Sequence, residues 1–333
     1  MVGSSVVTFT DPQPYQAATR PAQVEVLVTA KGDFHAELTR IELPRLLMQR
    51  GRESLPRIAR STVSSERPPI FFLADVDQAA VRHSGMKLSF GDIIAVGSCS
   101  PHHHRTWAPC HWATMSLTRE DLAATGYALV GRDLTVPPFS YGVRPARVSM
   151  SRLLQLHDAA GQLAKIAPEV LAKPEVVRAL EQALVHAMIM CLTDSTPIEM
   201  NRWDHRHSTI IARFEELLAA SQGCPLYLAE ICTAIGVAER TLRVCCHDHF
   251  GMGPIRYLWL RRMHLARHAL MCADSTTSTV TEIATEFGFW ELGRFSVAYR
   301  TLFGETPSAS LRRPPEDRPT SQNPLAFADS EYA

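Results

Sequence analysis

The feature that most constrains this chain is a pattern that occurs twice in its last third. The first copy is Ile231-Cys232-Thr233-Ala234-Ile235-Gly236-Val237, and the second, 52 residues later, is Ile283-Ala284-Thr285-Glu286-Phe287-Gly288-Phe289. In each copy a small residue (Cys232 or Ala284) allows a second helix to cross closely, and the following glycine (Gly236 or Gly288) permits a turn in which a β-carbon would clash. Two such units in tandem predict an all-α domain that reads DNA in the major groove.

Composition sets the limits within which this prediction must fit. A chain of 333 residues is long enough for two or three domains. Its 34 Lys and Arg balance 34 Asp and Glu, so any DNA contact must be local. Between 201 and 313 every Lys or Arg position is an arginine, which suits forked contacts to phosphates and guanine edges. The eight scattered cysteines lack a CxxC pair and indicate reduced thiols in a cytoplasmic protein without a metal or other cofactor.

The order of segments predicts an α+β chain. No signal peptide and no apolar run of about 18 residues is visible, so no membrane segment is expected. Strands are predicted at 24–28, 34–38, 70–73, 86–90 and 93–96, and helices at 151–166 and 174–192. The predicted division is a mobile N-terminus (1–22), a β-rich sensor domain (23–150), a helical connector (151–192), a linker (193–207), a DNA-binding domain (208–313) and a disordered tail (314–333). The connector either forms a homodimer or packs against its own β domain.

Helical periodicity selects the residues that face DNA. In the first recognition helix Leu242 and Cys246 share one face, which we expect in the core. In the second recognition helix we expect Phe295, Tyr299 and Leu302 to be buried. Arg240 and Arg243 are predicted to contact guanine or phosphate, Arg294 to read a base and Arg300 to bind a phosphate. The alternative for each is a solvated surface charge. The predicted DNA-contact residues are Arg240, Thr241, Arg243, Val244, His247, Glu291, Gly293, Arg294, Val297 and Arg300.

Residues 208–313 resemble the C-terminal domain of the AraC/XylS family of transcription regulators. The resemblance is carried by Gly236-Val237, Leu242, Phe250-Gly251-Met252-Gly253-Pro254, the segment 257–267, Val280-Thr281-Glu282-Ile283-Ala284, Gly288-Phe289, Arg294-Phe295-Ser296 and Phe303-Gly304-Glu305-Thr306-Pro307-Ser308. It covers about a third of the chain, and the segment 288–295 is also similar to the ethanolamine-operon regulator within that family.

The resemblance implies two helix-turn-helix units joined by one long helix, with both recognition helices in successive major grooves. It also implies activation through contact with RNA polymerase. Arg262 is expected to bridge the two units rather than to read bases. The positions expected to be structural are Gly236, Leu242, Arg262, Ala266, Ile283, Ala284, Gly288, Phe289, Phe295, Phe303, Gly304 and Pro307.

This chain departs from the family pattern in two ways. Ala238 and Trp290 stand where the family commonly has a Ser or Thr helix cap, whose loss costs about 1 kcal/mol. Val244 and Val297 replace frequent arginines, which predicts fewer phosphate contacts and a shallower salt dependence of DNA binding. We expect the Trp290 side chain to pack in the turn rather than to contact thymine methyl groups.

The β-rich region resembles the cupin-type effector domain common in this family. A Gly91-Asp92 turn precedes an apolar strand, and Pro101-His102-His103-His104 follows. Successive strand residues point to opposite faces, so the three histidines cannot all bind one metal ion, and we expect a polar loop there. Trp107, His111 and Trp112 either line a pocket for a small-molecule effector or belong to the barrel core.

The sequence leaves two enzymatic alternatives. Pro109-Cys110-His111 resembles a motif of DNA alkyltransferases, although Trp112 stands where that motif has arginine. A cupin enzyme with a metal bound by His102 and His104 is the other alternative. The leading hypothesis is a non-enzymatic, cytoplasmic transcription regulator. Its expected partners are double-stranded promoter DNA, RNA polymerase, an unidentified small-molecule effector and a second copy of the chain.

Overall fold

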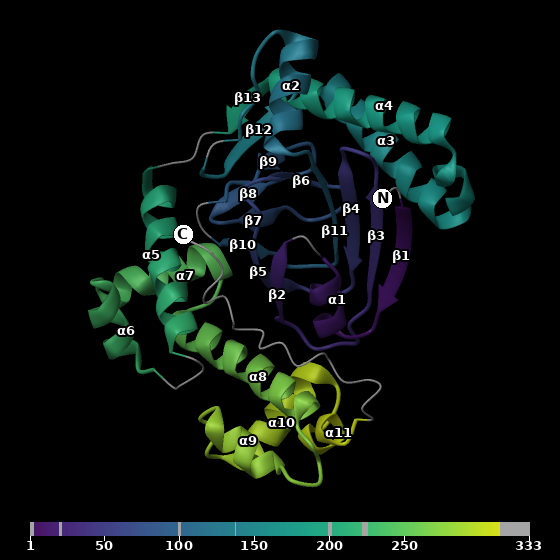
Figure 1. The fold of residues 1–333 in the computed structure, drawn as a ribbon. Coiled ribbons are helices and arrows are strands. Elements are labelled where there is room, and N and C mark those ends of the chain that lie inside the picture. Colours follow the sequence, from purple (N-terminus) through teal and green to yellow (C-terminus); the bar gives the residue numbers. More distant parts are fainter. Residues whose placement is uncertain are drawn as a thin grey trace. The chain divides into compact units, whose positions relative to one another are not determined.

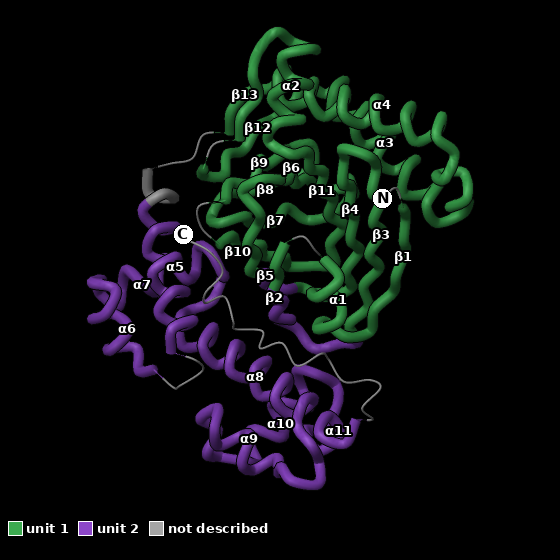
Figure 2. The backbone as a smooth tube through the Cα atoms, in the orientation of Figure 1, with its two compact units in different colours: residues 1–24, 34–56, 60–201 green, residues 25–33, 57–59, 202–333 purple. Residues whose placement is uncertain are grey.

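The computed structural model describes residues 3–19, 22–98, 101–136, 138–198, 202–221 and 226–313, with the side chains of 202–221 from Arg206 onward. The chain forms two compact units, shown in green and purple in Figure 2. The first consists of residues 1–24, 34–56 and 60–201, and the second of 25–33, 57–59 and 202–333. A β-rich N-terminal half and a helical C-terminal half confirm the predicted α+β class (Figure 1).

An eight-stranded antiparallel sheet forms the centre of the first unit. Alternate side chains of its strands lie on opposite faces, and one face carries apolar residues such as Met48, Phe72 and Met115. In spatial order the strands are β1 (Gly3–Phe9), β3 (Ala36–Glu42), β4 (Leu47–Glu53), β11 (Cys110–Ser116), β6 (Pro69–Leu73), β9 (Ile93–Ala95), β12 (Tyr141–Pro145) and β13 (Ser195–Ile198).

A second sheet contains shorter strands. β10 (His102–Arg105) pairs with β7 (Val81–His83), which forms a hairpin with β8 (Met86–Leu88). The hairpin turn consists of Ser84 and Gly85, both with positive φ, as a tight turn between twisted strands requires. Strands β2 (Gln23–Val28) and β5 (Arg57–Thr62) are divided between the two compact units.

Helices cover the apolar face of the large sheet. α3 (Arg147–Ile166) and α4 (Pro174–Thr193) contribute Leu153 and Leu184 to the same core cluster as Met48 and Met115. The helical connector therefore packs against its own β domain, which is one of the two alternatives left by the sequence. The unit also contains α1 (Pro12–Ala18), α2 (Arg119–Val130) and the 3₁₀ helix η1 (Pro168–Ala172).

By length and composition, α4 is the one helix in the described part of the chain that could cross a membrane. The apolar side chains Val177, Leu184 and Met188 are nevertheless buried against the rest of the first unit. This burial is what a core helix of a globular domain requires.

Several segments have more structure than the sequence predicts. Within the expected mobile N-terminus, residues 3–9 form β1 and 12–18 form α1, which Asp11 caps by accepting a 2.9 Å hydrogen bond from the Gln13 amide. Within the expected linker, residues 195–198 form β13, and α5 (Arg202–Ala220) begins at 202. α2 was not predicted, although Thr118 caps it by accepting from the Asp121 amide at 3.0 Å. The predicted disordered tail, 314–333, lies outside the described residues.

The second unit is built from helices around one core. After α5 they are α6 (Leu228–Ile235), α7 (Glu239–Phe250), α8 (Pro254–Cys272), α9 (Val280–Glu286), α10 (Leu292–Phe303) and α11 (Pro307–Leu311). Buried residues of this core include Phe214, Leu242, Met263 and Phe295.

Candidate nucleic-acid interface

Two helix-turn-helix units, α6–α7 and α9–α10, lie at the two ends of α8. Gly236 ends α6 with φ of 69°, and the Val237 amide donates to the Cys232 carbonyl at 3.1 Å. In the second helix-turn-helix, Gly288 has φ of 76°, and the Phe289 amide donates to the Ala284 carbonyl at 2.9 Å. Both glycines adopt the left-handed conformation that disfavours other residues. The repeated sequence pattern therefore corresponds to a repeated turn geometry.

Helix α7 separates a buried face from an exposed face as its periodicity predicts. Leu242 and Cys246 are fully buried, together with Cys245. Five predicted DNA-contact residues lie elsewhere on the helix: Thr241 is half-buried, and Arg240, Arg243, Val244 and His247 are exposed.

Helix α10 has the same division. Phe295, Tyr299 and Leu302 are buried in the core of the second unit. The other five predicted DNA-contact residues, which are Glu291, Gly293, Arg294, Val297 and Arg300, are exposed.

The beginnings of the two recognition helices differ from expectation at one position. Ala238 precedes α7 in extended backbone without a side-chain cap, and Glu239 in the first turn forms an ion pair with Arg243. α10 begins at Leu292, so Glu291 rather than Trp290 holds the cap position, and Glu291 pairs with Arg294 at 2.9 Å. The expected packing of Trp290 in the turn is wrong, because its side chain is 75% exposed. The Trp290 ring is therefore accessible to a molecule that binds the second helix-turn-helix.

Arginines of α8 hold the second unit together. The Arg262 guanidinium lies 5.4 Å from the ring centroid of Phe289, in the turn of the second helix-turn-helix, as a bridging residue would. Ala266 is fully buried. The neighbouring Arg261 forms a buried ion pair with Glu215 of α5 at 3.1 Å. The partners are 46 residues apart, so no local pattern in the sequence indicates this pair.

The end of α10 is closed by polar contacts. Gly304 follows Phe303 with φ of 76°, and Pro307 begins α11. Tyr299 Oη and Ser310 Oγ are 2.6 Å apart, and Glu305 accepts from Arg267 at 3.3 Å and from Arg313 at 3.0 Å. These contacts fix the C-terminal end of the recognition helix on α8 and α11.

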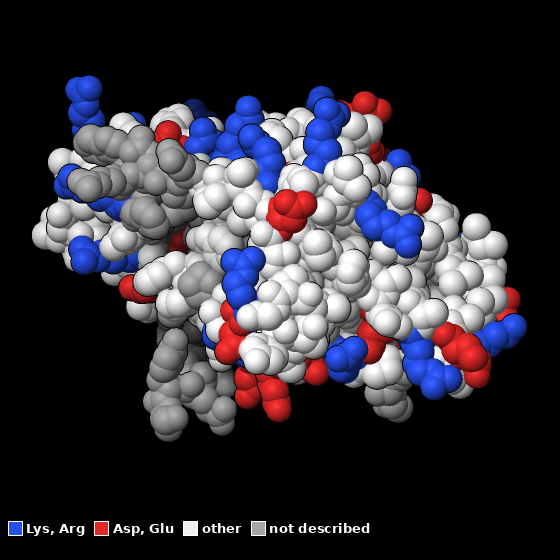
Figure 3. Space-filling model, turned by 90° about the horizontal axis from the view of Figure 1, so that it is seen from above, with Lys and Arg blue, Asp and Glu red and all other residues white. Residues whose placement is uncertain are grey.

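Charge is mixed on the face of the molecule that Figure 3 shows. Lys and Arg side chains are interspersed there with Asp and Glu and separated by uncharged surface. This agrees with the formal net charge of +0.

The histidine run forms a buried strand, not the expected polar loop. His102, His103 and His104 belong to β10 and are all buried. His83 Nδ1 and His104 Nε2 are 3.0 Å apart, and burial lowers the pKa of His102 to about 4. Among the described residues no group of three or more His, Cys, Asp or Glu side chains is arranged to hold a metal ion. At neutral pH the His102 ring is therefore an uncharged imidazole.

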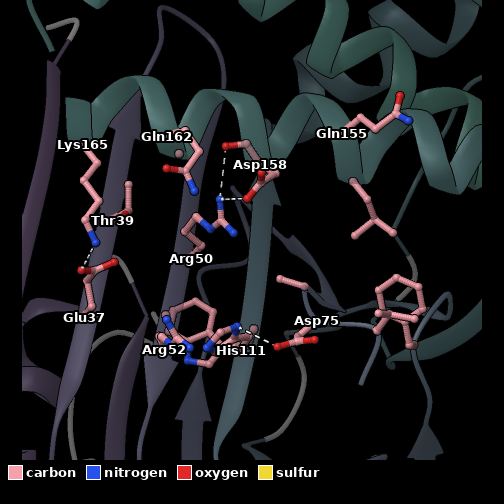
Figure 4. A pocket seen from close by; sticks show the side chains of 17 residues that line it. Glu37, Thr39, Arg50, Arg52, Asp75, His111, Gln155, Asp158, Gln162 and Lys165 are labelled. Carbon is pink, nitrogen blue, oxygen red and sulfur yellow. Dashed lines mark hydrogen bonds and ion pairs between the residues drawn. The ribbon is translucent and has the colours of Figure 1, made fainter. Parts of the chain in front are cut away.

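The predicted effector residues separate in the structure. His111 and Trp112 line a cavity of about 550 Å³ in the first unit, beneath α3 (Figure 4). Trp107 does not line it; this side chain is 46% exposed and stacks under the Arg105 guanidinium at 4.9 Å. Cys110, the residue of the alkyl-acceptor alternative, is buried, and burial of this kind disfavours attack on a DNA substrate.

Comparison with known proteins finds relatives of the helical half of the chain. Residues 231–313 match a family model described as a helix-turn-helix domain. The "Probable thc operon regulatory protein" of Rhodococcus erythropolis is 39% identical over 100 residues, which cover 30% of each chain. The "XylDLEGF operon transcriptional activator 1" of Pseudomonas putida is 36% identical over 77 residues, 23% of each chain. The "HTH-type transcriptional activator RhaS" of Salmonella schwarzengrund is 30% identical over 182 residues, 54% of this chain and 62% of the relative.

These alignments span less than two thirds of each relative's own length, and the first two span less than a third. The family model covers both turn glycines, both recognition helices and the long helix between them. Residues 231–313 of this chain are therefore a helix-turn-helix domain of the AraC/XylS type, as the resemblance in the sequence predicted.

Proposed function

We propose that this protein is a transcription regulator that binds promoter DNA through α7 and α10 and responds to a small molecule bound by its β-rich half. The observation that carries the DNA-binding part is the set of arginines on the solvent side of both recognition helices. Arg240, Arg243, Arg294 and Arg300 are all exposed, and the residues that anchor the same helices are buried. A bidentate arginine contact to guanine gives about 1–3 kcal/mol of base discrimination.

Two of these arginines have partners in the free protein that DNA must replace. Arg243 pairs with Glu239 and Arg294 pairs with Glu291, each within one turn of its own helix. Exposed pairs of this kind contribute about 0–1 kcal/mol, so exchange of a carboxylate for a phosphate or a guanine edge costs little. Arg240 forms no such ion pair with a described residue of its own helix turn. It is therefore the first choice for a base contact.

Apolar side chains complete the proposed reading face. Val244 is 45% exposed, Val297 is 69% exposed and Trp290 is 75% exposed. Exposed apolar groups on a major-groove helix can contact the methyl group of thymine. We therefore add Trp290 to the proposed DNA-contact residues and expect A·T pairs opposite Val244 and Val297.

The small-molecule part of the proposal is supported by the cavity that His111 and Trp112 line. Its size of about 550 Å³ is within the range of ligand sites in proteins. The relatives named as operon regulators and activators support regulation rather than catalysis. The proposal includes two further partners, RNA polymerase and a second copy of this chain. It also includes a cytoplasmic location.

Footprinting of the purified full-length protein on the DNA upstream of its own and neighbouring genes tests the DNA-binding part. We expect a protected stretch of about two helical turns that weakens as salt rises. Arg240→Ala and Arg294→Ala should lose sequence-specific protection, and Arg178→Ala, an exposed arginine on α4, should not. Unchanged protection by both recognition-helix variants would contradict the proposed reading face.

A further inference from the structure

The cavity beneath α3 and a second hollow share a row of charged side chains. The first, of about 550 Å³, lies between α3 and strands β3, β4 and β11 (Figure 4). The second, of about 580 Å³, extends toward β1 and the loop that precedes β11. Glu37, Arg52, Asp75 and His111 line both hollows. These four side chains therefore lie at the junction of the two hollows.

Strand register places three of the four residues side by side. Arg52 on β4 lies opposite Glu37 on β3 and opposite His111 on β11. Directly opposite residues on neighbouring antiparallel strands have Cβ atoms about 4.5–5.5 Å apart, close enough for their side chains to interact. One cation thus lies between a carboxylate and an imidazole on the same face of the sheet.

The carboxylates around the junction already have partners. Glu37 accepts from Lys165 of α3 at 2.6 Å, and Asp75 lies 3.4 Å from His111 Nδ1. Deeper in the cavity Asp158 of α3 pairs with Arg50 at 2.9 Å, as Figure 4 shows. The Arg52 side chain, by contrast, forms no hydrogen bond or ion pair with any other residue that the structure describes. Its guanidinium has five N–H donors that a ligand can use.

We propose that this cavity binds a small organic carboxylate, whose carboxylate group accepts from Arg52 beside His111. The inference rests on the proposed function, because the ligand would be the small molecule that the β-rich half senses. An anion is favoured over a cation because the nearby carboxylates are paired and Arg52 is not. Val76, Phe90 and Leu154 supply apolar lining for the body of the ligand, and Gln155 and Gln162 of α3 supply amide groups.

Two glycines give the cavity its shape. A β-carbon at Gly51 would overlap the Trp112 indole, so glycine on β4 lets the ring close the floor of the cavity. A β-carbon at Gly161 would overlap the Arg50 guanidinium, which lies against α3. Glycine at position 161 therefore leaves the space in which Arg50 reaches Asp158 of the same helix.

His111 should take up a proton when the carboxylate binds. Burial and the charges of Arg52 and Arg50 lower the pKa of His111, whereas Asp75 and Glu37 raise it. A further anion beside the ring raises this pKa, so the bound state holds more protons than the free state. Affinity should therefore increase as pH falls toward the ordinary histidine range of about 6.5.

Calorimetric titration of the full-length protein with matched acid and amide pairs tests the proposal. The probes are phenylacetate with phenylacetamide, and hexanoate with hexanamide. At least one acid should bind, and its uncharged amide should bind at least about tenfold more weakly. Arg52→Gln should lose a similar factor for the acid, and Arg178→Gln on the surface of α4 should not. Arg52→Gln should keep the circular dichroism spectrum, because the native side chain is exposed and unpaired.

Each other outcome overturns the proposal. Three results would contradict the proposed carboxylate site. They are equal affinity for acid and amide, equal affinity of Arg52→Gln and the unchanged protein for the acid, and no binding of either acid. DNA footprinting of the same samples separates this result from the proposed function. Acid binding without a footprint would keep the site and reject the regulator, whereas a footprint without acid binding would reject the site alone.

Discussion

At the scale of single residues, the charges beside a buried ionisable group decide whether it stays charged. Arg261 is 4% exposed and lies against Glu215, 1% exposed, in the second unit. Burial alone would lower the pKa of Arg261, but Glu25 and Glu215 raise it above the ordinary value, so the guanidinium stays charged. Removal of Glu215 would weaken this compensation, and breaking a buried pair typically costs about 3–5 kcal/mol. This ion pair therefore joins α5 to α8 structurally, away from the exposed reading faces.

His157 of α3, unlike Arg261, has a pKa shifted so that its buried side chain is uncharged. We therefore expect the first unit to be sensitive to acid. Burial, and then the charge of Arg50, lowers its pKa to about 3. Between about pH 6.5 and pH 3 the unfolded chain binds a proton here that the folded chain does not, so stability falls as pH falls. Each such histidine lowers the free energy of unfolding by up to about 1.4 kcal/mol per pH unit. Urea unfolding at several pH values should show a shallower dependence for His157→Gln.

The control for this prediction is His186→Gln, an exposed histidine on α4. Its pH dependence should match that of the unchanged protein. The remaining dependence of His157→Gln has a source in His102, whose pKa burial lowers to about 4. Equal slopes for His157→Gln and the unchanged protein would mean that His157 becomes protonated within the folded state.

At the scale of elements, the first and second helices of the helix-turn-helix units begin differently: α9 has a side-chain cap, whereas the recognition helices α7 and α10 have none. Thr279 accepts from the Glu282 amide at 3.2 Å, and Glu282 accepts from the Thr279 amide at 2.8 Å, which forms a capping box before α9. Ala238 has the extended backbone of a cap residue before α7 but no side-chain acceptor. We therefore expect Ala238→Ser to raise the free energy of unfolding of the second unit by about 1 kcal/mol, and Thr279→Ala to lower it by a similar amount.

Urea unfolding followed by the helical circular dichroism signal checks both cap variants. Ala234→Ser, on the exposed side of α6, makes the same chemical change away from a cap and should not stabilise, because serine is a poorer helix former than alanine. Stabilisation by both serine variants would indicate an effect other than capping.

The elements that the sequence predicted are those specified by short-range signals. The two turns follow from a glycine at a fixed position, and the faces of α7 and α10 follow from helical periodicity. β1 was not predicted because its side chains are mostly solvent-exposed and its partner is the distant strand β3. Arg52 was not recognised beside His111 because β4 and β11 are neighbours in space but far apart in the chain. Non-local strand pairing carries no signature in local composition.

At the scale of the whole molecule, the DNA-binding half includes pieces of the β-rich sequence. Leu27 and Ile58 belong to the same core cluster as Leu242 and Phe295. The Val28 carbonyl accepts a 3.2 Å hydrogen bond from His264 of α8. A domain boundary drawn at residue 208 therefore leaves out part of the compact unit that carries the recognition helices.

The segment that follows β2 brings charge next to the second recognition helix. Lys31, Gly32 and Asp33 line a hollow of the second unit together with Val297 and Arg300 of α10. If α10 enters the major groove as proposed, phosphates should attract Lys31 and repel Asp33. Asp33→Asn should therefore strengthen DNA binding. Lys31→Gln should weaken it and reduce the slope of log affinity against log salt by about 0.9.

Fluorescence anisotropy with a footprinted DNA site, at several salt concentrations, measures both effects. Lys87→Gln on β8 of the first unit removes an exposed cation that lies outside this hollow and should leave affinity and slope unchanged. Opposite shifts for the two loop variants would place the segment beside DNA in the complex. Identical curves for both would mean that residues 31–33 leave α10 when DNA binds, because charges retained there would lie within a Debye length of about 10 Å of the phosphates.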